Sequence, residues 1–203
     1  MKTAVPLLLV MLALAGCSQE TENPKAKTMA AWKAFQKVDH DLNEANLPEL
    51  KLEDAPSFPP WIKYYQDKAY AYSEIDTDGV DQLLTDHLGN SIKSHQQVAA
   101  VLQNIYADIL ALMKSRNGDI DASRAVGQLL ADDEHQETAA TFAELFYRFA
   151  SDDDFQGKLH EIRAKHRSDF DAAAAEYDKV ADADKMVAKS LSDKYGTPFV
   201  DVF

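Results

Sequence analysis

The stretch that decides the fold is FQGKLHEIRAKHRSDFDAAAAEYDKVADADKMVAKSLSDKY, residues 155–195. Its apolar residues recur at steps of four and three, a repeat close to 3.5 residues, which is typical of a coiled-coil seam. Such a pattern predicts one long helix, about 60 Å in length at 1.5 Å per residue. The acidic run at residues 151–154 supplies its N-cap, and Gly196 followed by Pro198 ends it. The predicted seam consists of Phe155, Leu159, Ile162, His166, Phe170, Ala173, Tyr177, Val180, Asp184, Val187, Leu191 and Tyr195.

A second helical pattern of similar length runs from Gly79 to Asn117, with Gly89 and Asn90 as a possible kink or break. Shorter helical patterns flank the two long ones, and no stretch alternates as strands do. The sequence therefore predicts an all-α fold: an elongated helical bundle with two long antiparallel helices. The shorter predicted helices cover residues 28–45, 57–75, 120–131 and 134–150, with a proline-rich connector at residues 47–60.

The N-terminus carries a different signal. Lys2 precedes an apolar run from Ala4 to Ala13, which is too short for a stable membrane-spanning helix of about 20 residues but suits a secretory signal. Leu14-Ala15-Gly16-Cys17 closes the run and resembles the lipobox of bacterial lipoproteins. That resemblance implies cleavage after Gly16 and acylation of Cys17. We therefore expect a signal peptide at residues 1–16, a lipidated flexible tether at 17–27 and a helical bundle domain at 28–203.

The resemblance also implies a cellular location for the protein. Ser18, rather than an aspartate, follows the cysteine, which by the sorting rule of enterobacteria-like lipoproteins implies the outer membrane, facing the periplasm. Cys17 is the only cysteine, so an acylated chain has no disulfide and no cysteine metal site. The formal net charge of −13 disfavours nucleic acid as a partner and favours a basic protein.

One loop resembles a calcium site in part. With Gly79 at the sixth position of an EF-hand loop, Glu74, Asp76 and Asp78 occupy the first, third and fifth positions. The twelfth position, however, is Thr85 in place of a bidentate glutamate. We expect an acidic turn that caps the next helix and keep the three carboxylates as weak metal candidates.

Other groups of titratable or aromatic residues are expected to have structural rather than functional roles. Asp132 and His135 share a helix start without a second copy on another helix, and His87 and His95 lack readable catalytic partners. A basic cluster at residues 158–167 is expected to be balanced by neighbouring acids, and the aromatic patch at residues 56–65 to close one end of the core. The sequence contains no nucleophile elbow, phosphate loop or zinc-protease motif. We therefore expect no enzyme activity and no cofactor.

A short region also resembles the YiaF-like lipoprotein family, whose function is unknown. The similar segments are Lys33-Ala34-Phe35, Leu47-Pro48-Glu49-Leu50, Phe58-Pro59-Pro60 and Tyr70-Ala71-Tyr72-Ser73. The resemblance covers about 40 residues and implies a helical lipoprotein body.

Together these observations predict a non-enzymatic, lipid-anchored envelope protein that acts through protein–protein contacts, with an unidentified protein partner. Two alternatives stay open. One is a periplasmic immunity protein that neutralises a basic toxic effector, which the negative charge suits. The other is an envelope protein that binds calcium or a small ligand.

Overall fold

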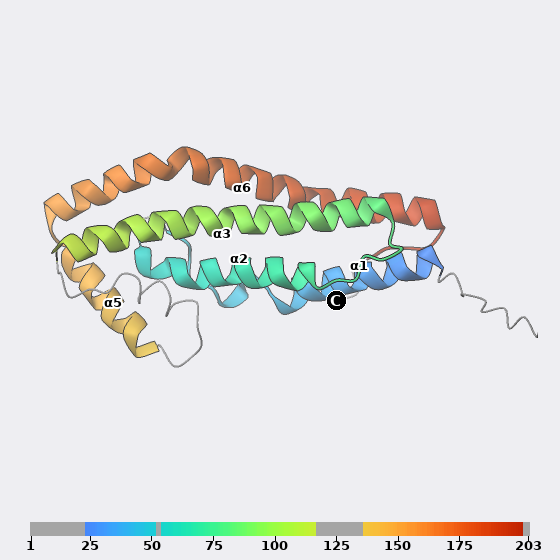
Figure 1. The fold of residues 1–203 in the computed structure, drawn as a ribbon, viewed down its shortest axis with the longest axis horizontal. Helices are drawn as coiled ribbons and strands as arrows, with labels where there is room; N and C mark the ends of the chain where they lie inside the picture. Colours follow the sequence, from blue (N-terminus) through green and yellow to red (C-terminus); the bar gives the residue numbers. More distant parts are fainter. Residues whose placement is uncertain (1–22, 52–53, 117–135, 201–203) are drawn as a thin grey trace, which may run out of the picture.

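The fold is built on two long helices that run in opposite directions. The computed structural model describes residues 23–51, 54–116 and 136–200, and side chains only from residue 143 in the last of these ranges. α3 spans Gln82–Arg116 and α6 spans Asp153–Tyr195. Figure 1 shows α6 lying along α3, with α2 (Phe58–Ser73) against the opposite side of α3. At 1.5 Å per residue, α3 and α6 are about 52 and 65 Å long.

Contacts between α3 and α6 establish the antiparallel arrangement. His87, near the start of α3, bonds to Asp184 near the end of α6. Farther along α3, Asp108 bonds to His166, and Arg116 at its end contacts residues at the start of α6. Residues later in α3 thus contact residues earlier in α6, so the two helices are antiparallel. The predicted all-α bundle with two long antiparallel helices is confirmed.

The predicted seam of α6 is also confirmed. The members of the seam that are buried lie on one face of α6, and its other five members, such as Asp184, are partly buried. The buried members are Phe155, Leu159, His166, Ala173, Val180, Val187 and Leu191. The side chain of Asp152 accepts a hydrogen bond from the amide of Phe155 and so caps the helix. Gly196 ends it in the left-handed conformation, as expected from its position before Pro198.

The first helix differs from the prediction at both ends. α1 spans Pro24–Asp41, so residues 24–27 are helical and the predicted tether at 17–27 is too long. The reason is local, because Asn23 caps the amide of Lys25 and Pro24 occupies the first turn, where its missing N–H costs nothing. The helix ends at Asp41, before the predicted stop at Asn46 and Pro48.

Residues after α1 form two short 3₁₀ helices, η1 (Glu44–Asn46) and η2 (Ala55–Ser57), before α2 begins at Phe58 as predicted. α5 spans Gln136–Phe149, close to the predicted range. The predicted helix at residues 120–131 lies outside the described residues.

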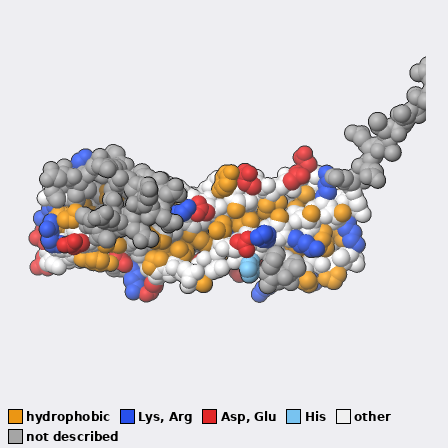
Figure 2. Space-filling model, turned by 90° about the horizontal axis from the view of Figure 1, so that it is seen from below, with side chains coloured by type: hydrophobic (Ala, Val, Ile, Leu, Met, Phe, Trp, Pro, Cys, Tyr) orange, Lys and Arg blue, Asp and Glu red, His pale blue; other side chains and the backbone are white. Residues whose placement is uncertain are grey.

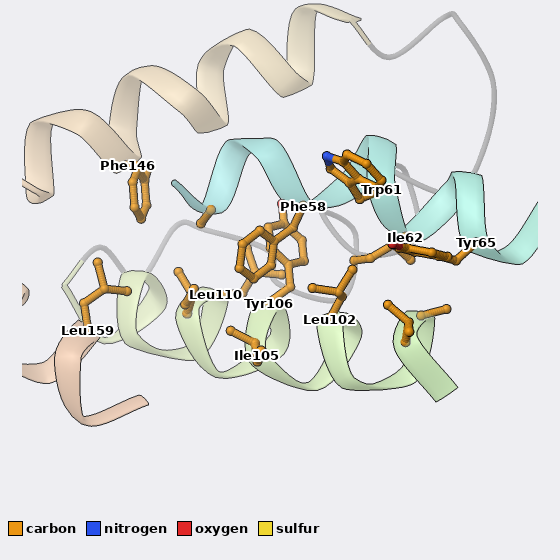
Figure 3. Packing of buried hydrophobic residues seen from close by; sticks show 14 of the residues in the cluster. Phe58, Trp61, Ile62, Tyr65, Leu102, Ile105, Tyr106, Leu110, Phe146 and Leu159 are labelled. Carbon is orange, nitrogen blue, oxygen red and sulfur yellow. The ribbon is translucent and has the colours of Figure 1, made fainter. Parts of the chain in front are cut away.

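The core is divided into two clusters along the rod. The larger one lies where α2, α3 and α5 meet the first half of α6, with Phe58 and Leu102 fully buried (Figure 3). The predicted aromatic patch is part of this cluster through Trp61, Tyr64 and Tyr65. The smaller cluster joins α1, the last turn of α2, the first turns of α3 and the last turns of α6. Its members include Trp32, Phe35, Tyr72, Leu84, Leu88, Val187 and Leu191.

A hydrogen-bond network closes the end of the rod beyond the smaller cluster. The carboxylate of Asp81 accepts from the amide of Leu83, from Lys194 and from the hydroxyl of Tyr195. The amide of Asp81 donates to Thr28 on α1. One buried residue before α3 therefore ties together the ends of three helices.

α3 is one continuous helix through Gly89, so the glycine does not divide it. A Cβ atom at Gly89 would meet nothing within 4 Å. We expect Gly89→Ala to raise the free energy of unfolding by about 0.5–1 kcal/mol, because alanine is the better helix former and restricts the unfolded chain. Urea denaturation measures the change. A decrease in stability would contradict the open environment at this position.

Candidate functional site

Two adjoining cavities between α1 and α6 form the candidate functional site. The outer one is an open groove of about 730 Å³, and the inner one is a pocket of about 240 Å³ that reaches toward α2 and α3. Four residues line both cavities: Phe35 and Asp39 from α1, and Ala181 and Asp184 from α6. We call these four residues the throat. The throat residues of α1 and those of α6 are about 145 positions apart in the sequence.

The groove has mostly apolar walls and a charged rim. Trp32 and Phe35 on α1 face Ala188 on α6, and Phe199 from the C-terminal segment packs edge-on against Trp32 at 6.3 Å between ring centroids. Lys185 and Lys189 stand at its exposed edge. Figure 2 shows a band of hydrophobic side chains along one face of the molecule, with acidic, basic and histidine side chains beside it. Such a mixture suits a ligand that has both an apolar and a charged part.

On the α1 side of the throat, Asp39 is held by two residues of α2. Lys68 places its ammonium 2.8 Å from Oδ1 of Asp39, and the hydroxyl of Tyr72 donates to the same oxygen. The side chain of Lys68 is only 9% exposed, and its ammonium also donates to the hydroxyl of Tyr64 at 3.1 Å. A buried ammonium thus receives a carboxylate and a phenol as partners, which offset its loss of water.

The α6 side of the throat has a matching arrangement. Nε2 of His87, on α3, lies 2.7 Å from Oδ1 of Asp184. The ring of His87 is almost fully buried and packs edge-on against Phe35, with 5.3 Å between centroids. Asp39 and Asp184 are themselves about one-third exposed, so each is anchored from inside and presents its carboxylate to the cavities.

His95 lines the inner pocket and has an unusual environment. Its Nδ1 lies 2.7 Å from the carbonyl oxygen of Ser91, so Nδ1 carries the proton. The rings of Tyr65, Tyr72 and Tyr177 surround it, with centroids 5.1–5.9 Å from its own. Burial lowers the pKa of His95 to about 4, and the ring is neutral at pH 7. Nε2 is then a hydrogen-bond acceptor, and it has no hydrogen-bond partner within the described parts of the chain.

Four kinds of group around the inner pocket are poorly suited to proton transfer at neutral pH: His95, Ser91 and Ser94, Tyr72, and Tyr177. A histidine whose pKa is about 4 is a weak base at neutral pH. The hydroxyls of Ser91 and Ser94 donate to backbone carbonyls of their own helix and not to a histidine ring. Burial raises the pKa of Tyr72 and Tyr177, so both phenols stay protonated.

Of the site residues expected from the sequence, Glu74, Asp76 and Asp78 are described, and they line neither cavity. Gly16 and Cys17 are outside the described residues, as are Asp132 and His135. Glu74, Asp76 and Asp78 form the turn before α3, where the carboxylate of Asp76 accepts the amide of Asp78 at 3.0 Å. In the described ranges, no group of three or more His, Cys, Asp or Glu side chains is placed to hold a metal ion. The structure does not assemble the weak calcium candidate.

The basic cluster at the start of α6 is balanced, as predicted, although partly by residues of other elements. Lys158 pairs with Asp154 and Arg167 with Asp171 on the same helix. Asp108 of α3 receives both Lys165 and His166, whose hydrogen bonds hold the pKa of Asp108 below its usual value.

Sequence reasoning missed Asp39 and Lys68, and it gave Asp184 only a place in the seam. A signal for two of them was present. Lys68 lies among the apolar positions of α2, four residues after Tyr64 and four before Tyr72, and Asp184 interrupts an otherwise apolar repeat. A charged residue on a buried helix face indicates a buried partner or a site.

No protein-family model, curated protein or solved structure matches this chain. Among the described helices, none is long and apolar enough to cross a membrane.

The buried, neutral His95 predicts a pH dependence of stability. Its pKa is about 4 in the folded state and about 6.5 when unfolded, so between these values the unfolded chain binds more protons. Stability should therefore fall by about 2 kcal/mol between pH 7 and pH 5. We expect His95→Gln to remove most of this decrease and His40→Gln, at an exposed position, to leave it unchanged. Urea denaturation at both pH values measures it; an equal pH dependence in the His95 variant would contradict the assignment.

Proposed function

We propose that this protein is a lipid-anchored, non-enzymatic protein of the cell envelope that faces the periplasm and binds a protein partner in the groove between α1 and α6. The observation that carries the binding role is the groove itself, an open cavity of about 730 Å³ with apolar walls and two carboxylates at its base. The segment Leu14-Ala15-Gly16-Cys17 supports the anchor, and Ser18 supports the outer membrane.

The anchor and the groove are close in the chain. α1 begins at Pro24, seven residues after Cys17, and the groove is lined by the same helix. Seven residues span at most about 25 Å when extended. A lipid on Cys17 would therefore hold α1, and with it the groove, near the membrane surface, where an envelope partner meets it.

The anchor is tested in growing cells that express the full chain. We expect globomycin to cause an unprocessed precursor to accumulate, and the Cys17→Ser variant to lose both acylation and membrane fractionation. A Ser18→Ala variant is the matched control and should still be acylated. Normal processing in the presence of globomycin would overturn the anchored assignment.

An immunity protein that neutralises a basic effector is the second candidate. The net charge of −13 favours it, as do the carboxylates of Asp39 and Asp184 at the base of the groove. An immunity gene lies beside the gene for its effector. A genomic neighbourhood without a basic toxin-like protein would count against this candidate and leave the broader proposal in place.

A further inference from the structure

We propose that the throat formed by Phe35, Asp39, Ala181 and Asp184 binds a lysine side chain of the protein partner. This inference rests on the proposed function, because it names the group that the groove recognises. The occupant is a lysine on an exposed segment of a basic protein, with its ammonium at the two carboxylates and its alkyl stem along the groove.

The charge at the throat favours a cation. Asp39, Asp184 and Lys68 are the formally charged side chains that line the inner pocket, and their formal charges sum to one negative charge. Oδ1 of each aspartate is already bonded, to Lys68 and Tyr72 or to His87. The side chains of both aspartates are still about one-third exposed. Each carboxylate, one on α1 and one on α6, therefore keeps accessible oxygen surface for a donor that enters from the groove.

The protein already holds an ammonium of this kind. The ammonium of Lys68 contacts the carboxylate of Asp39 and lies 5.4 Å from the ring centroid of Tyr64. A partner lysine would meet similar chemistry, because Phe35 lines both cavities with the two aspartates and Trp32 lines the outer groove. Long lysine side chains commonly bury their stems on apolar surface in this way.

The inner pocket adds a preference for donors over acceptors. Nε2 of His95 is a buried acceptor without a partner, and it lines this pocket together with Asp39 and Asp184. An incoming ammonium, or a water molecule that solvates it, brings the N–H or O–H groups that such acceptors need. A carboxylate or phosphate would instead face two carboxylates and a bare ring nitrogen.

The lysines at the edge of the groove do not cancel this preference. Lys189 is paired with Asp193 at 2.7 Å, and the side chains of both lie mostly in solvent. Lys185 is exposed at the rim, outside the throat. Charges in solvent are screened over about 10 Å at ordinary salt, whereas the half-buried carboxylates act at contact distance.

The test is a titration of the purified, ¹⁵N-labelled full chain with the peptide Ac-Ala-Lys-Ala-NH₂. The chain has two tryptophans: Trp32 lines the groove, and Trp61 lies in the larger core cluster with its indole N–H bonded to Pro48. We expect a saturable shift of the Trp32 indole signal and no shift of the Trp61 signal. The same peptide with Nε-acetyl-lysine, which has lost its charge, should bind at least about tenfold more weakly.

Asp184→Asn is the decisive variant, because asparagine still accepts a hydrogen bond from His87 but removes the charge. It should weaken binding of the lysine peptide at least about tenfold, whereas Asp182→Asn, at an exposed position of α6 outside both cavities, should not. An unchanged melting temperature of the Asp184 variant shows that the fold is intact. Equal binding of the acetylated peptide, equal binding by the Asp184 variant, or a silent Trp32 signal would each overturn the lysine assignment. If cross-linking from position 185 still shows that the groove contacts an envelope partner, the proposed function stands and only the lysine assignment fails.

Discussion

Replacing Asp81 with alanine is expected to lower the free energy of unfolding by about 3 kcal/mol. The side chain of Asp81 is 4% exposed and accepts hydrogen bonds from the amide of Leu83, Lys194 and Tyr195. Its loss removes the N-cap of α3 and leaves two donors of α6 without their acceptor. An N-cap contributes about 1 kcal/mol, and a hydrogen bond to a charged group about 1.5–3 kcal/mol.

Two further variants separate the contributions of Asp81. Asp81→Asn keeps an acceptor for Leu83 and removes the charge that faces Lys194, so it should cost about 1–2 kcal/mol. Asp86→Ala is the matched control, since this exposed aspartate on the next turn of α3 bonds only to Gln82 among the described residues. Urea denaturation of the three variants measures the differences. A loss below about 1 kcal/mol for Asp81→Ala would contradict its role in joining three helix ends.

The same residue predicts a loss of stability in acid. Burial disfavours the ionised form of Asp81, but the hydrogen bonds from Lys194, Tyr195 and the amide of Leu83 outweigh burial and hold its pKa below the usual value. A carboxylate with a lowered pKa stabilises the fold above its unfolded pKa of about 4, and the contribution is lost below it. The stability lost through Asp81 is lost at a lower pH than the stability lost through His95, so the two contributions can be measured separately.

Phe58→Ala is expected to have the largest effect on stability, about 4 kcal/mol. Phe58 is fully buried in the larger cluster, against Tyr106 of α3 at 6.4 Å between ring centroids. Truncation of a buried phenylalanine to alanine removes its apolar contacts and leaves a cavity, which together cost about 3–5 kcal/mol. Tyr70→Ala is the control on the same helix, because Tyr70 is 66% exposed.

The positions of the two core clusters predict that Phe58→Ala lowers stability without affecting the groove. Phe58 lies in the cluster that α5 helps to cover, whereas the groove is next to the smaller cluster at the other end. We therefore expect the Phe58 variant to lose stability in urea denaturation while it binds the lysine peptide normally under conditions where it is folded. Loss of binding by the folded variant would show that the groove depends on the distant cluster.

Much of the fold could be predicted from periodicity, because a helix repeats its buried face along the local sequence. The seam from Phe155 to Tyr195 specified α6, and the acidic N-cap and Gly196 specified its ends. The start of α1 was readable too, since Asn23-Pro24 is a good N-cap and first-turn pair. The prediction placed the boundary at Thr28 because the first apolar residue of the pattern comes only at Met29.

The candidate site could not be predicted, because it depends on which helices meet. Asp39 and Asp184 become neighbours of one cavity only through the packing of α1 and α6, and local periodicity contains no information on that pairing. The sequence gives His87 no visible carboxylate partner, since Asp184 lies 97 residues farther along the chain. Only Lys68 and Asp184 could have been identified from the sequence, because each is a charged residue among the apolar positions of a helix.

Photo-cross-linking in intact cells tests most directly whether the groove is where this protein acts. A photoreactive amino acid at position 185, on the rim of the groove, is combined with either of two substitutions of exposed alanines on α6. Ala181→Trp fills the throat, and Ala172→Trp lies outside both cavities. We predict one discrete adduct with an envelope protein that the Ala181 variant loses and the Ala172 variant keeps. An adduct that is equally strong in both variants would contradict the assignment of the groove as the binding site.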